Sequence, residues 1–155
     1  MKSKVPSKTL VVAADDSVAR FFGFLRAENR LAEFLTMSNP QARLKEQMLI
    51  SDSPGRAFDS VGAGRHQLEQ RGSREHNAER FAATVADKID ALCANENVYR
   101  LAVVAAPRFL GRLRPQLSAH SRSLLVAEID KEMATDSADE ILLATADYLL
   151  APLSD

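Results

Sequence analysis

The sequence predicts an α/β fold, a three-layer sandwich in which helices cover a mixed five-stranded sheet. In the first third of the chain, three short apolar runs follow one another too closely for helices to lie between them, which is typical of an antiparallel meander. In the last half, helical periodicity alternates with two more apolar runs, which is typical of parallel crossovers. The 155 residues are 46% hydrophobic, enough for one domain with a substantial core.

The three strands of the meander are expected at residues 9–14, 18–25 and 31–37. The first, TLVVAA, is apolar after its initial threonine and is therefore expected to be a buried strand. Turn-forming residues separate the strands, Asp-Asp-Ser at 15–17 and a second turn at 27–30. The pattern predicts two hairpins in succession.

The segment after the meander predicts a short helix and then a long loop. A cap residue followed by proline at 38–40 predicts a helix over about 40–48. Residues 51–73 contain four of the six glycines and lack apolar periodicity. Unstructured connections longer than about 12–15 residues are uncommon in compact domains unless they are functional or disordered. We expect this loop to be functional.

The longest helix is expected over about 74–94, because apolar residues recur there on one face. That face consists of Phe81, Val85, Ile89 and Leu92, widened by alanines and Cys93. Polar residues lie off the stripe, so we expect the helix to pack one face against the sheet.

The remaining elements follow from shorter signals. Apolar runs at 99–105 and 124–129 predict the last two strands, with a short helix between Pro107 and Pro115. Ser137, with Glu140 three residues later, forms a capping box that predicts the start of the last helix.

Composition excludes several classes of protein. The net charge of −1 does not suit a polycation that binds nucleic acid nonspecifically, and one cysteine cannot form an internal disulfide. No apolar run reaches the ~18–20 residues of a membrane span. We expect a flexible basic tail at 1–8, a single domain at 9–155, a cytoplasmic location and no membrane partner.

Enzymatic chemistry has one candidate among the acidic residues. Asp15, Asp16 and Asp130 end strands and could bind the metals of a nuclease, but the two consecutive aspartates also suit a simple hairpin turn. The three histidines lack metal-ligand spacing, and Cys93 fits a buried core position. We favour the turn and predict no catalytic residue, metal ligand or cofactor.

Positive charge gathers in residues 97–127, which contain no acidic residue but five arginines. Arg108 and Arg112 follow a predicted strand at the start of a helix, where free N–H groups favour an anion. We expect a phosphate-like anion near Arg108, although a solvated arginine face is the simpler alternative.

The long loop offers a second candidate site. Gly62 and Gly64 can adopt backbone angles that are unfavourable for other residues. They would place Arg65 and His66 at the exposed tip of the loop. The alternative is a flexible surface loop without a function.

Several motifs together resemble the bacterial host-attachment protein family, whose name records a requirement for attachment to host cells. The motifs are VVAAD at 11–15, SDSPGRAFDS at 51–60, GAGRH at 62–66, HNAERFA at 76–82, PRFLG at 107–111 and AEIDK at 127–131. The resemblance spans about residues 9–150 and implies a phenotype rather than a defined reaction.

The glycine loop, the helix after it and the next strand more distantly resemble the middle domain of archaeal and eukaryotic class 1 release factors and of Pelota. This resemblance implies a ribonuclease H-like fold and contact with RNA or the ribosome through residues 62–66. The family's Gly-Gly-Gln motif is absent, which argues against peptidyl-tRNA hydrolysis.

Taken together, the residues favour a non-enzymatic binding protein that contacts RNA or the ribosome and affects attachment indirectly. Two alternatives remain open. One is a hydrolase, either a nuclease using Asp15, Asp16 and Asp130 or a release-factor-like peptidyl-tRNA esterase. The other is an adaptor that binds a protein partner.

Overall fold

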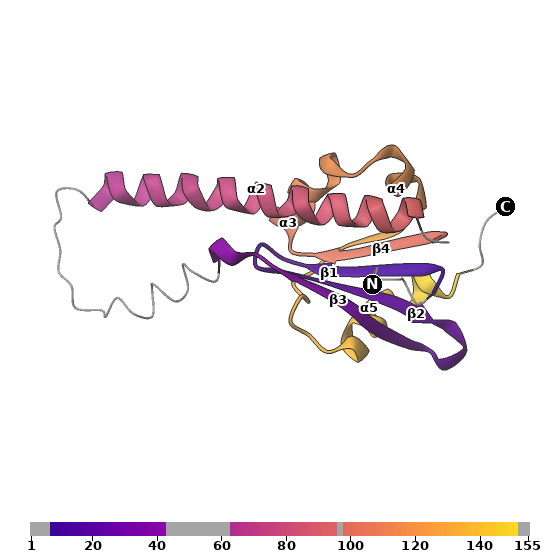
Figure 1. Cartoon of the computed structure of the whole chain (residues 1–155). Coiled ribbons are helices and arrows are strands. Elements are labelled where there is room, and N and C mark those ends of the chain that lie inside the picture. The colour runs from indigo at the N-terminus through magenta and orange to yellow at the C-terminus, as the bar shows by residue number, and fades with distance from the viewer. Residues whose placement is uncertain (1–6, 43–62, 96–97, 152–155) are drawn as a thin grey trace.

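The computed structural model describes residues 7–42, 63–95 and 98–151 of the chain. Its centre is a five-stranded sheet in the order β3-β2-β1-β4-β5 (Figure 1). β1 pairs antiparallel with β2 and parallel with β4, while β2–β3 is antiparallel and β4–β5 is parallel. The expected α/β fold with a mixed sheet, a meander followed by crossovers, is confirmed.

The strand boundaries agree closely with those expected. β1 (Thr9–Ala14) and β2 (Val18–Leu25) begin and end at the expected residues. The other three strands differ from expectation by one residue at an end or at both ends: β3 (Arg30–Ser38), β4 (Arg100–Ala105) and β5 (Leu125–Asp130). All six residues of β1 are buried, because neighbouring strands flank it and helices cover both faces.

Helices lie on both faces of the sheet. One face carries α2 (Ala63–Asn95), α3 (Pro107–Leu113) and α4 (Ala119–Leu124), and the other carries α5 (Ala138–Leu149) (Figure 1). Successive residues of β1 enter different cores, since Leu10 and Val12 face the first layer while Val11 and Ala13 face the second.

The apolar stripe of α2 packs as expected. Phe81 is 6% exposed, and Val85, Ile89 and Leu92 are also buried. The ring centroid of Phe81 lies 6.2 Å from that of Phe109 on α3, so the two helices share one core.

The prediction of an irregular loop over residues 51–73 is wrong for its last part. α2 begins at Ala63, eleven residues before the expected start at 74, so Gly64, Arg65 and His66 lie in helical turns and not at a loop tip. Most residues of 65–71 have high intrinsic helix propensity. The packed half of α2 already supplies the nucleus, so each added residue extends the helix without a second nucleation cost. Gly62 and the rest of the loop lie outside the described residues.

The helix ends follow local capping signals. The Ser137 hydroxyl accepts the N–H of Glu140 at the start of α5, which confirms the expected cap. Ser118 caps α4 in the same way, accepting the N–H of Ser121, but this six-residue helix is too short to show periodicity and was not expected. Residues 40–42 are helical, and the remainder of the helix expected over 40–48 lies outside the described residues.

Candidate functional site

The N-terminal half of α2 extends beyond the sheet (Figure 1). We call residues 63–77 the arm. Residues 72–76 are all exposed, Asn77 is half-buried, and Ala78, 4% exposed, is the first buried position. The arm is therefore the part of α2 that precedes its first buried residue and does not contribute to the core.

The described side chains of the arm are polar and of both charges. Arg74 and His76 are exposed, with Glu75 between them. Among the described residues, no ion pair joins Arg74 to a carboxylate. A free guanidinium and an imidazole on an exposed helix suit contacts with phosphates and base edges.

A pocket of about 490 Å³ lies at the carboxyl ends of the parallel strands β1, β4 and β5, and no described residue of the arm lines it. It is lined by residues after β1 (Asp15, Asp16 and Ser17), by the first residues of α3, including Arg108, and by Glu132. In open α/β sheets, ligands bind preferentially outside these strand ends.

The carboxylates of Asp15 and Asp16, which line this pocket, both accept hydrogen bonds from other residues. The Asp15 Oδ1 accepts the backbone N–H groups of Ser17 at 2.8 Å and Val18 at 2.9 Å, which confirms the hairpin turn. The Arg112 Nη1 donates to both carboxylate oxygens of Asp16, at 3.1 and 3.2 Å. The charge of Arg112 is thus compensated.

The two arginines of the expected anion site have different surroundings. Arg112 is bound to Asp16, whereas Arg108 is exposed and lines the same pocket. Asp15, Asp16 and Glu132 line it too, so an anion beside Arg108 would meet carboxylates nearby. A phosphate near Arg108 stays a prediction.

Within residues 7–42, 63–95 and 98–151, no group of three His, Cys, Asp or Glu side chains is placed to bind a metal ion. Asp130 is exposed at the end of β5, and Glu128 on the same strand pairs with Arg114. Burial raises the pKa of the Cys93 thiol, as expected for a core cysteine that does not react.

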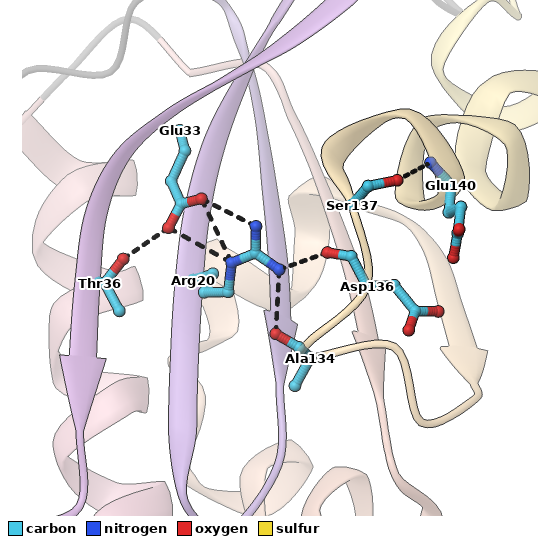
Figure 2. A network of polar contacts seen from close by, with 7 residues as sticks. All are labelled: Arg20, Glu33, Thr36, Ala134, Asp136, Ser137 and Glu140. Atoms are coloured by element: carbon cyan, nitrogen blue, oxygen red, sulfur yellow. Dashed lines mark hydrogen bonds and ion pairs between the residues drawn. The ribbon is translucent and has the colours of Figure 1, made fainter.

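Sequence reasoning missed a network that fixes the segment between β5 and α5 (Figure 2). The Arg20 Nη2 lies 2.9 Å from the Glu33 Oε1, and its Nη1 donates to the carbonyls of Ala134 at 3.0 Å and Asp136 at 2.6 Å. The guanidinium carbon also lies 5.1 Å from the ring centroid of Phe22. Opposite charges on neighbouring antiparallel strands were the available signal. The network holds the segment that carries Glu132.

Comparison with known proteins gives a matching family model and likenesses to solved structures. The family model described as "Protein required for attachment to host cells" matches residues 10–143. No curated protein matches the chain. The activator of the 2-hydroxyisocaproyl-CoA dehydratase from Clostridium difficile with bound ADPNP is 12% identical, over 98% of this chain and 67% of that chain, with a TM-score of 0.41. A likeness at this level defines neither ligand nor reaction.

No described helix is both long and apolar enough to cross a bilayer.

Proposed function

Because the chain belongs to the family of proteins required for attachment to host cells, we propose that it acts by binding an RNA-rich partner, such as the ribosome, through the arm of α2. The family name describes a phenotype, so the molecular activity has to come from the chain itself. Attachment would then depend on this protein indirectly.

The exposure of the arm carries this proposal. In a protein, a helix is normally stabilised by packing an apolar face against the rest of the fold. Residues 72–76 bury none, and the side chains of Arg74, Glu75 and His76 are all exposed. A helix that is polar all round suits a bridge to another molecule.

Arginine and histidine favour RNA as the partner. Guanidinium groups bind phosphates bidentately and stack on bases, and a histidine ring can stack as well. Arg74 and His76 offer this chemistry on the exposed part of the arm, and Arg65 and His66 belong to its first turns. Arg65 and His66 were expected from the sequence on a loop and stay predicted contacts on a helix, whereas Arg74 and His76 are added to them here because they are exposed.

We also propose that the domain is ribonuclease H-like, as in the release factors. The sheet order β3-β2-β1-β4-β5, with an antiparallel meander and parallel crossovers, supports a ribonuclease H-like domain of the kind found in release factors. A cytoplasmic location would suit an RNA partner.

A crosslinked pull-down from bacterial lysate, with and without ribonuclease, tests the proposal. The parent chain should capture RNA or ribosomal proteins, and ribonuclease should release the ribosomal proteins. Arg74→Ala with His76→Ala should lose most of this capture. His120→Ala with Arg122→Ala is the matched control, because it removes the same two residue types from exposed positions on α4.

Capture that survives ribonuclease unchanged would point to a protein partner and an adaptor role. Equal losses in the two double variants would show that net charge, and not the arm, determines binding.

A further inference from the structure

A second pocket, of about 430 Å³, lies at the opposite end of the sheet from the aspartates. It is bounded by the start of β1, the end of β2 and the start of β4. Lys8, Arg26 and Arg100 line it together with the apolar groups of Phe24, Leu25 and Tyr99. Positive charge and apolar surface therefore meet in one cavity.

Arg100 is the unusual member of this group. It is 4% exposed, and its Nη1 donates to the carbonyl of Leu149 at 2.9 Å and lies 3.4 Å from that of Tyr148. Its Nη2 is buried and has no hydrogen-bond partner in the described structure. Buried polar groups are nearly always paired, so an orphan guanidinium nitrogen indicates a missing acceptor.

The capping of α5 explains only part of this arrangement. Arg100 and Arg26 both donate to carbonyls at the end of α5, since the Arg26 Nη2 lies 3.2 Å from the Leu150 oxygen. Cations stabilise a helix C-terminus in this way. The carbonyls are neutral, however, and they bind Nη1 of Arg100, while no acceptor among residues 7–42, 63–95 and 98–151 binds Nη2.

Negative charge to balance these cations is scarce. Among the described residues that line the pocket, Glu28 is the one acidic residue, and its carboxylate is bound to Arg30 at 2.9 Å. Burial, with a smaller effect from the charge of Arg26, lowers the pKa of Arg100 from its ordinary value. Arginine nevertheless stays charged at neutral pH. A buried charge without a carboxylate partner is costly, and an incoming anion would reduce that cost.

We propose that this pocket binds a small organic anion, a carboxylate or phosphate ester carried on an apolar body. The anionic group would lie among Lys8, Arg26 and Arg100, where it would balance the buried charge of the Arg100 guanidinium. The apolar body would contact Phe24 and the Tyr99 ring. This site is independent of the arm, which belongs to a different part of the fold.

Three probes of similar size test the proposal by NMR titration of the full chain: phenyl phosphate, benzoate and benzyl alcohol. Either anion, or both, should shift the side-chain N–H signals of Arg100 and saturate, while benzyl alcohol should bind at least about tenfold more weakly. The two anions distinguish a phosphate site from a carboxylate site.

Arg26→Ala and Lys8→Ala remove exposed cations from the pocket, and each should weaken anion binding several-fold to about tenfold. Arg122→Ala removes an exposed charge from α4 and should leave it unchanged. The proposal is overturned if neither anion binds, if benzyl alcohol binds equally well, or if Arg26→Ala and Lys8→Ala bind like the parent. Because these variants keep Arg100 and its helix cap, a failure to fold is not expected to obscure the result.

Discussion

Arg112 on α3 binds Asp16 in the turn after β1, with its Nη1 3.1 Å from one carboxylate oxygen and 3.2 Å from the other. The contact joins α3, the helix after β4, to the turn between β1 and β2. β1 pairs parallel with β4 and antiparallel with β2, so the contact links the parallel and antiparallel parts of the sheet. The contact also compensates the charge of Arg112, whereas Arg108 forms no ion pair within the described part of the chain.

The Arg112–Asp16 pair should contribute modestly to stability. Its side chains are 17% and 45% exposed, so a double-mutant cycle with Arg112→Met and Asp16→Asn should give a coupling of about 0.5–1 kcal/mol in urea unfolding. The Arg30–Glu28 pair, with side chains 55% and 59% exposed, is the control and should give a smaller coupling. Equal couplings for the two pairs would contradict this assignment.

Glu33 should make stability depend on pH. Its hydrogen bond to Arg20, more than any other cause, lowers the pKa of its carboxyl group below the ordinary 4.5. A group whose pKa is lowered by folding stabilises the protein above its unfolded pKa, and that contribution is lost as the pH falls through the folded value.

The free-energy difference between the parent and Glu33→Gln should therefore be constant near neutral pH and shrink below pH 4.5. Urea unfolding at several pH values measures it. In an Arg20→Met background the same substitution should show a weaker pH dependence. A difference that grows on acidification would have the wrong sign for this ion pair.

Phe81→Ala should destabilise the protein by about 3–5 kcal/mol, because it removes a buried ring from the core shared with Phe109. Leu143→Ala, at a position 80% exposed on α5, should change stability by less than about 0.5 kcal/mol. Chemical unfolding measures both. A cost below about 1 kcal/mol for Phe81→Ala would mean that α2 does not pack as described.

Arg108 should support weak binding of phosphate at the carboxyl-end pocket. Phosphate should raise the melting temperature more than chloride at equal ionic strength, and Arg108→Ala should reduce the difference. Phosphate also stabilises many proteins because it is excluded from their surface. The comparison of the parent with Arg108→Ala, and not the rise in melting temperature alone, therefore decides whether the site exists. Glu132→Gln should increase the effect by removing a carboxylate from the pocket. An unchanged difference in Arg108→Ala would exclude the site.

Much of the fold could be predicted because local signals and tertiary packing agree. β1 is apolar after Thr9 and lies at the centre of the sheet, and the stripe from Phe81 to Leu92 faces the core. The arm could not be predicted in the same way, since a polar helical extension shows no apolar period. Glycines at 62, 64 and 72 pointed to a loop, whereas the neighbouring helix formers continue α2.

The sites were harder to predict than the fold, because they depend on contacts distant in sequence. The Arg112–Asp16 contact spans 96 positions and Arg20–Asp136 spans 116, so neither has a local pattern. Arg100 was recognised only as one arginine of a basic stretch. Its burial depends on α5, nearly fifty residues later, whose carbonyls bind it.

A photoreactive benzoylphenylalanine at Gly72 tests most directly whether the arm binds RNA. Gly72 is exposed, and a Cβ atom added there would meet no described atom within 4 Å beyond its chain neighbours and the backbone of its own helix, so the substitution should leave the fold intact. Leu143, exposed on α5 on the opposite face of the sheet, is the control position. After irradiation in lysate, the Gly72 variant should yield ribonuclease-sensitive crosslinked species and the Leu143 variant should not. Equal crosslinking from both positions, or none to RNA from Gly72, would contradict binding through the arm.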